Sequence, residues 1–180
     1  MRTIEEQILD HVKSTPDKIA LISGETEVTY SQMWDYCLAA AASLKSKYNI
    51  KRGDRVILSA AGNIEFVYVY FGVHIAGGIC VPIDPDINQT RFDYIEKSTA
   101  PVCVIGTLQN VTHESVQFSE VVEGSEMAEY YAPEMGQVAD IRFTTGTTGA
   151  PKGVALSYAN LSAAANNINT FIQNPKYDVE

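Results

Sequence analysis

The 180-residue chain contains 46% hydrophobic and 19% charged residues, a composition typical of one globular domain and unlike that of a disordered or fibrous protein. Its 13 basic and 22 acidic residues give a net charge of −9, which argues against nucleic acid or anionic lipid as a partner. The three cysteines, Cys37, Cys80 and Cys103, are widely spaced and lack the spacing of a metal site, so we expect no metal ligands. We expect them to be reduced, partly buried thiols of a cytoplasmic protein.

The start of the chain lacks the features of an export signal, because three acidic residues fall within the first ten positions. A longer uncharged run, residues 66–83, approaches the length of a membrane span. Gly77, Gly78 and Pro82 would break a helix within this run. We therefore predict a buried helix, a tight turn and a buried strand, and no membrane-spanning helix.

The first quarter of the chain predicts two helices around a β-hairpin. Apolar residues at a spacing of four predict an amphipathic helix over 3–12. Two β-rich runs, 18–23 and 27–30, flank a glycine-containing turn and predict the hairpin. Ser31 is expected to cap a second helix that ends near Lys47.

From residue 55 onward, short apolar runs alternate with helical patterns. We predict, in chain order, a strand at 55–60, a helix at 64–75, a strand at 77–84, a helix at 91–97, strands at 101–106, 138–143 and 153–157, and a helix at 158–171. The irregular segment 108–135 is assigned to loops, one short helix and a solvated face of glutamates. This alternation indicates an α/β fold with an open, mainly parallel sheet and flanking helices.

Several side chains are assigned to structure and not to function. Helical spacing predicts that an aromatic group belongs to the core: Trp34, Tyr36, Phe66, Tyr68, Tyr70 and Phe71. The three histidines, His11, His74 and His113, have no Asp, Cys or Ser partner at a telling spacing. We therefore interpret none of them as catalytic.

The run FTTGTTGAPKG at 143–153 combines four threonines, three glycines and one lysine, with no acidic residue. Glycine lets backbone N–H groups approach an anion closely, and threonine hydroxyls and the lysine ammonium group add further donors. Predicted strands on both sides place the run at the edge of the sheet, where α/β proteins commonly bind ligands. The run therefore predicts a phosphate-binding loop, with a simple flexible turn as the alternative.

The run does not fit the Walker A motif. Aligned on Gly146, that motif needs glycine at position 151 and a hydroxyl residue at 153, where the chain has Pro151 and Gly153. The nearest candidate for a Walker B strand ends in Asp84 but is interrupted by Pro82. These departures disfavour a P-loop NTPase.

A longer segment around the loop, FTTGTTGAPKGVALSYANL at 143–161, resembles the signature of the adenylate-forming enzymes. This superfamily includes acyl-CoA synthetases, peptide-synthetase adenylation domains and luciferases. Three upstream segments resemble its early motifs in the same order: VTYSQM at 28–33, GDRVIL at 53–58 and GVHIAGGICVPIDP at 72–85. The resemblance implies that residues 1–180 form the N-terminal portion of an AMP-binding domain, the first part of the large domain, with no C-terminal lid domain.

The resemblance also implies a reaction. A complete enzyme of this kind would use ATP and Mg²⁺ to convert a carboxylic acid into an acyl-adenylate with release of pyrophosphate. It would then form a thioester, with coenzyme A as the expected acceptor. The resemblance thus implies an acid–thiol ligase of the acyl-CoA synthetase type that acts in fatty acid metabolism. The segments that the family uses after the loop are missing here, so we expect the chain alone to be inactive.

The resemblance assigns the phosphate contacts to one set of residues, with Lys152 as the catalytic member: Thr144, Thr145, Gly146, Thr147, Thr148, Gly149, Lys152 and Gly153. Two positions depart from the family pattern, because Thr145 stands where serine is common and Tyr158 where many relatives have histidine.

Two other functions are compatible with the sequence: a non-catalytic nucleotide- or phosphate-binding module, and an interaction domain derived from such an enzyme. Because a partial sheet domain would expose apolar faces or an unpaired strand edge, we also expect self-association.

Overall fold

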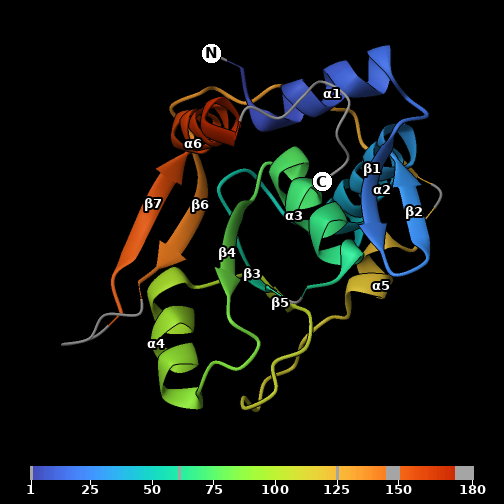
Figure 1. The fold of residues 1–180 in the computed structure, drawn as a ribbon. Helices are drawn as coiled ribbons and strands as arrows, with labels where there is room; N and C mark the ends of the chain where they lie inside the picture. The colour runs from blue at the N-terminus through green and yellow to red at the C-terminus, as the bar shows by residue number, and fades with distance from the viewer. Residues whose placement is uncertain (1, 61, 125, 145–150, 173–180) are drawn as a thin grey trace.

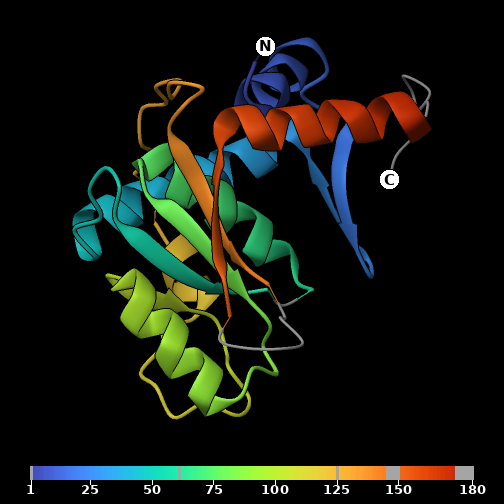
Figure 2. The same ribbon diagram turned by 90° about the vertical axis from the view of Figure 1, so that its left-hand side faces the viewer.

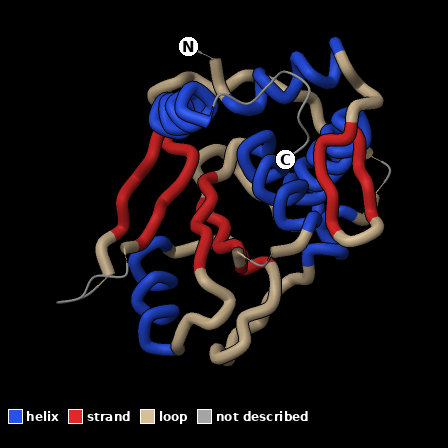
Figure 3. Tube along the Cα trace, viewed as in Figure 1, coloured by secondary structure: helices blue, strands red, loops and turns tan. Residues whose placement is uncertain are grey.

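The computed structural model of the protein describes residues 2–60, 62–124, 126–144 and 151–172. The chain begins with helix α1 (Ile4–Ser14), strands β1 (Ile19–Ser23) and β2 (Thr26–Thr29), and helix α2 (Tyr30–Lys47) (Figure 1). The two strands pair antiparallel as the predicted hairpin and form a small sheet of their own, apart from the main sheet (Figure 3).

The rest of the chain builds a five-stranded sheet and the helices around it. In order, its elements are β3 (Arg55–Ser59), α3 (Ile64–Ala76), β4 (Ile79–Ile83), α4 (Gln89–Thr99), β5 (Cys103–Ile105), α5 (Phe118–Val122), β6 (Val138–Phe143), β7 (Gly153–Ser157) and α6 (Tyr158–Ile172). The strand order is β5-β3-β4-β6-β7, in which the first four strands run parallel and β7 pairs antiparallel with β6. This arrangement confirms the predicted α/β fold with an open, mainly parallel sheet.

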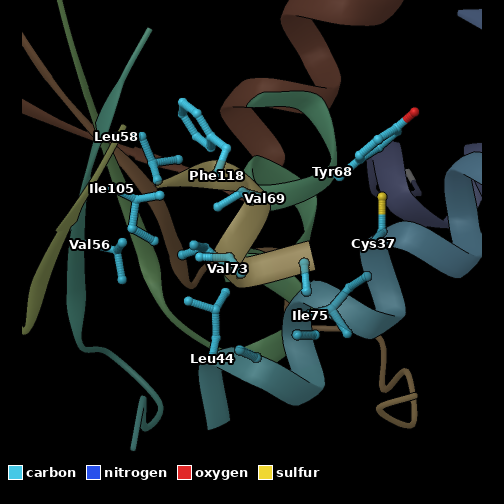
Figure 4. Close-up of a cluster of buried hydrophobic side chains, with 14 of the residues drawn as sticks. Cys37, Leu44, Val56, Leu58, Tyr68, Val69, Val73, Ile75, Ile105 and Phe118 are labelled. Carbon is cyan, nitrogen blue, oxygen red and sulfur yellow. The ribbon is translucent and has the colours of Figure 1, made fainter. Parts of the chain in front are cut away.

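Helices cover both faces of the sheet. Each strand contributes side chains to both faces, because successive residues of a strand point to opposite sides. Val56 and Leu58 of β3 join the larger core cluster with α2 and α3, and Figure 4 shows both beside side chains of α3. Ile57, between them, joins a second cluster on the other face, where α4 contributes Phe92 and Ile95. The parallel strands are therefore buried on both sides, as the continuous apolar runs predict.

Helices α2 and α3 pack closely through small residues. A Cβ added at Gly72 of α3 would lie 2.7 Å from the Cβ of Ala40 in α2. Ala40 and Ala41 are fully buried. Glycine at position 72 is thus required by the close approach of the two helices.

The uncharged run at 66–83 forms the predicted helix, turn and strand. Helix α3 is capped by Asn63 and ends at Gly77, whose φ of 88° only glycine adopts readily. No helix within the described part of the chain combines the length and apolar character needed to span a membrane.

Two predictions of local structure are wrong. Thr29, and not Ser31, caps α2: its side chain accepts a hydrogen bond from the Gln32 N–H group while the Gln32 side chain accepts one from the Thr29 N–H group. Tyr36 is 43% exposed and stacks on the buried Tyr68 at a ring-centroid distance of 4.7 Å, so it covers the core from outside.

Other predictions about side chains are confirmed. Cys37 and Cys80 are buried free thiols, and Cys103 is partly buried. The glutamates of the irregular segment are exposed: Glu114, Glu120, Glu123, Glu126, Glu129 and Glu134.

Helix α6 runs across one end of the sheet and extends past it (Figure 2), with Ile168 55% and Phe171 89% exposed.

Candidate functional site

The candidate phosphate-binding loop connects the last two strands of the sheet. Strands β6 and β7 pair in register up to Phe143 and Gly153. Beyond this pair the Thr144 N–H group donates a hydrogen bond to the Lys152 carbonyl oxygen at 3.0 Å, which closes the two ends of the loop. The loop begins at the carboxyl end of β6, which runs parallel to β4. This is the edge where ligands bind in open α/β sheets.

The structure describes three of the eight predicted phosphate-contacting residues. Thr144, Lys152 and Gly153 lie together at the root of the loop, and all three are exposed. The remaining predicted residues lie outside the described residues: Thr145, Gly146, Thr147, Thr148 and Gly149.

Gly153 has a packing role at this position. An added Cβ would lie 3.1 Å and 3.2 Å from two ring atoms of Phe143 and 3.4 Å from Ile141 Cγ2. The first two distances are tighter than ordinary van der Waals contact. Glycine here lets β7 pass close to the Phe143 ring, a reason that the sequence analysis did not identify.

A small cavity lies beside the root of the loop. It has a volume of about 210 Å³ and is lined by residues after β4, by helix α4 and by Phe143. Two carboxylates, Asp84 and Asp86, and the guanidinium group of Arg91 also line it. Arg91 Nη2 donates a hydrogen bond to the Thr144 carbonyl oxygen at 3.4 Å. Arg91 is not among the predicted site residues, because 53 positions separate it from Thr144 and no local pattern connects the two.

Tyr158 lies at the opposite end of β7 from the loop. The five residues of β7 separate the two, about 16 Å of extended chain. The Tyr158 side chain is buried, and its ring meets that of His74 edge-on at a centroid distance of 5.3 Å. Burial raises the pKa of the Tyr158 phenol. The Tyr158 side chain therefore packs with a different group of residues from the phosphate-binding loop.

His74, Tyr158 and the beginnings of β4 and β6 border a larger cavity of about 490 Å³. Its lining combines apolar residues with the polar side chains of Arg52, Glu134 and Gln137, in addition to His74 and two tyrosines. Because it lies at the amino ends of the parallel strands, away from the loop, we do not include it in the phosphate site.

A buried ion cluster joins α1, α3 and β6. His74 contacts Glu5 Oε1 through Nδ1 at 2.7 Å and Asp140 Oδ1 through Nε2 at 3.1 Å. Side-chain exposure is 1% for His74, 2% for Glu5 and 0% for Asp140. Tyr70 and Arg142 also donate hydrogen bonds to Asp140, with Arg142 Nη2 at 2.8 Å from Oδ2. Sequence spacing predicts no partner for His74, but the fold brings two carboxylates to it.

The charges of this cluster stabilise one another. Burial alone would lower the pKa of His74, but interactions with Cys80, Asp140 and Glu5 outweigh it and raise that pKa well above its ordinary value. Burial opposes ionisation of Glu5 and Asp140, yet the hydrogen bonds from His74, and at Asp140 also from Arg142, lower their pKa values. We interpret the cluster as a protonated imidazole between two carboxylates.

The ion cluster also contains three side chains that could coordinate a metal ion. The donor atoms of His74, Cys80 and Asp140 lie within 4.8 Å of one another. These donors are already engaged, because Asp140 accepts three side-chain partners and Cys80 donates its thiol to the Tyr70 carbonyl oxygen. Burial also raises the pKa of Cys80, which disfavours the thiolate that a metal needs. The arrangement therefore suits an ion cluster better than a metal centre.

Comparison with known proteins places this geometry in context. A family model described as AMP-binding enzyme matches residues 8–179. Gramicidin S synthase 2 of Brevibacillus brevis is 28% identical over 165 residues, which are 89% of this chain and 4% of that protein. The 2-succinylbenzoate–CoA ligase of Bacillus cereus (strain Q1) is 25% identical over 170 residues, 92% of this chain and 35% of that protein.

Solved structures show the same fold. VinN superposes with a TM-score of 0.85 at 22% identity, over 98% of this chain and 48% of that chain. The o-succinylbenzoate coenzyme A synthetase (MenE) of Bacillus subtilis in complex with AMP superposes with a TM-score of 0.83 at 21% identity, over 95% and 47%. The chain therefore spans about half the length of these solved chains and 35% or less of the two curated relatives named above.

Proposed function

The chain belongs to the AMP-binding enzyme family, and from this premise we propose that it supplies the phosphate-binding loop of a ligase that activates a carboxylic acid with ATP. The products of the first step are an acyl-adenylate and pyrophosphate. The observation that carries the proposal is the closed root of the loop, where Thr144 and Lys152 are joined at the carboxyl edge of the parallel sheet.

Lys152 is the proposed catalytic residue. Its exposed side chain belongs to the loop root, and its ammonium group would donate to the β- and γ-phosphates. Negative charge grows on the departing pyrophosphate as the carboxylate attacks the α-phosphorus, and a donor already in place stabilises that charge. The hydroxyl groups of Thr144, Thr145, Thr147 and Thr148 would add donors of the same kind.

Mg²⁺ would enter with ATP, whose phosphates are its usual ligands together with one or two carboxylates. Near the loop root, Asp84 and Asp86 line the small cavity, but Asp84 Oδ1 accepts the Asp86 N–H group within a turn. We therefore assign no magnesium ligand to the described residues and derive no step from the ion.

For the second step we propose transfer of the acyl group to a thiol. The relatives include a CoA ligase and a gramicidin synthase, at 25% and 28% identity. Coenzyme A is the acceptor to test first, and a role in fatty acid metabolism would follow only if the acid is a fatty acid.

The proposal is tested by carboxylate-dependent exchange of pyrophosphate into ATP, measured on the full-length product of the gene with a panel of carboxylic acids. Lys152→Ala removes a charge-assisted hydrogen bond worth roughly 1.5–3 kcal/mol, so we expect exchange to fall about ten- to a hundredfold. Lys97→Ala, which removes an exposed lysine of α4, is the matched control and should exchange normally.

Two results would overturn the proposal. One is the absence of exchange with every acid while Mg·ATP binds tightly, which would favour a non-catalytic nucleotide-binding module. The other is binding of neither ATP nor pyrophosphate, which would favour an interaction domain.

A further inference from the structure

Helix α4 places an arginine at the root of the loop. Arg91 is the third residue of α4, and its backbone N–H group donates to the Asn88 side chain at 3.0 Å, which caps the helix. The helix is fixed to the sheet by Phe92 and Ile95, which are 0% and 1% exposed. Arg91 therefore projects from a rigid element, and Figure 1 shows α4 at the end of the sheet where β6 stops and β7 starts.

Both polar groups of the Thr144 backbone form hydrogen bonds. The carbonyl oxygen accepts from Arg91 Nη2 at 3.4 Å, and the N–H group donates to the Lys152 carbonyl oxygen at 3.0 Å. A continuous chain of contacts thus runs from the guanidinium group through Thr144 to Lys152.

The direction of the Arg91 side chain is informative. Asp84 and Asp86 line the same cavity, yet Arg91 forms no ion pair with either, among the residues that the structure describes, and reaches the Thr144 carbonyl oxygen. The Arg91 Nε atom is buried and has no hydrogen-bond partner among the described residues. Arginine presents a planar fork of donors, which a lysine on a flexible stem does not reproduce.

We infer that Arg91 is a positioning residue for the phosphate-binding loop. It fixes the Thr144 peptide group, and through the Thr144–Lys152 hydrogen bond it orients the part of the chain that carries the catalytic lysine. This inference rests on the proposed function, since the loop must bind phosphate for its orientation to affect affinity. Preorganised donors bind a charged ligand more tightly than donors that must be ordered on binding.

The test uses the full-length product of the gene and compares the wild type with Arg91→Gln, Arg91→Lys and Lys97→Gln. Lys97 is exposed on the same helix, so Lys97→Gln removes an equal charge away from Thr144. Two quantities are measured for each variant: hydrogen exchange of the Thr144 amide by NMR, and the Kd for Mg·ATP by calorimetry. We expect Arg91→Gln to exchange faster at Thr144 and to bind Mg·ATP about tenfold more weakly, the size expected from one lost charge-assisted hydrogen bond. Arg91→Lys should not restore either value, and Lys97→Gln should match the wild type.

If the Thr144 amide of Arg91→Gln exchanges at the wild-type rate, the inference is overturned. Faster exchange throughout the protein would also overturn it, because it would indicate a merely structural role for Arg91. Unchanged Mg·ATP affinity in Arg91→Gln, with weakened affinity in Lys152→Ala, would overturn the inference and leave the proposed function standing. Wild-type affinity in Lys152→Ala, or no binding by the wild type, would instead overturn the proposed function, whereas Thr144 exchange would still report on the Arg91 contact.

Discussion

Strand β6 carries two polar sites of opposite character. Within the strand, Asp140 is fully buried and accepts hydrogen bonds from three side chains. Just past its end, Thr144 and Lys152 are exposed, and they are joined to each other through backbone groups, a contact that does not use the hydroxyl or the ammonium group. A buried polar group whose partners are all present stabilises the fold, whereas exposed donors on a fixed backbone are available for binding.

The largest effect is expected from the buried site. Asp140→Ala would leave the charges of His74 and Arg142 without their shared partner. We expect the free energy of unfolding to fall by about 3–5 kcal/mol, measured by urea denaturation. Asp35→Ala, at an exposed position of α2, should change it by less than about 0.5 kcal/mol. Equal losses in the two variants would remove the distinction drawn between the sites.

Lys152→Ala should show the reverse pattern. Its loss of exchange activity, about ten- to a hundredfold, corresponds to roughly 1.4–2.7 kcal/mol of transition-state stabilisation. The free energy of unfolding should stay within about 0.5 kcal/mol of the wild type, because the side chain is exposed. A melting temperature that drops along with activity would indicate that Lys152 acts through the fold.

The buried site should also give stability a particular pH dependence. The pKa values of Glu5 and Asp140 lie below their ordinary values of 4.5 and 3.8, so their contribution is complete above these values and is lost as the pH falls through the lower folded pKa values. The pKa of His74 is raised, so its contribution is complete below its ordinary value of 6.5 and declines as the pH rises toward the folded pKa. Between pH 6.5 and the folded pKa we expect the free energy of unfolding to fall by up to about 1.4 kcal/mol per pH unit.

Denaturation of His74→Gln over the same pH range is the control for this slope, since the variant lacks the titrating group. A wild type whose stability is flat above pH 6.5, or a variant with the wild-type slope, would contradict the assignment of a protonated imidazole.

A smaller effect is expected where the exposed site meets the sheet. Gly153→Ala would press a methyl group against the Phe143 ring and should cost about 1 kcal/mol, measured by thermal denaturation. Gly136→Ala, where an added Cβ meets nothing within 4 Å, is the matched control and should be neutral or slightly stabilising. If both variants melt alike, the close contact at Gly153 carries no energetic weight.

The smallest effect concerns self-association. Strand β7 is the last strand in the described sheet, and Val154 on it is 45% exposed. We expect weak association at high concentration in sedimentation velocity, reduced by Val154→Lys because a charge on an edge strand opposes pairing. A wild type that sediments as a monomer at every concentration would rule this out.

The two sites also differ in how far the sequence predicts them. The loop is contiguous, so its composition alone indicates phosphate binding, and the alternation of apolar runs predicts the sheet that presents it. The ion cluster joins residues separated by 69 and 66 positions, and Arg91 is similarly remote from Thr144. No local pattern encodes such contacts, because they depend on the order of strands in the sheet.

Local errors had local causes. Thr29 and Ser31 are both residues that favour a helix N-cap, and the Gln32 side chain, which completes a capping box with Thr29, was the available signal. Helical spacing predicts Tyr36 in the core, but α2 places it at the edge of the core, where it is 43% exposed and stacks on Tyr68.

The buried Glu5 also bears on how the chain is made. Glu5 leaves the ribosome before His74, which compensates its buried charge and follows 69 positions later. Until α3 has been synthesised, docking of α1 would bury the Glu5 carboxylate without its partner, which is costly. Helix α1 is therefore expected to dock only after α3 has formed, and a protease site engineered in α1 should remain cleavable on nascent chains until the segment containing His74 has emerged.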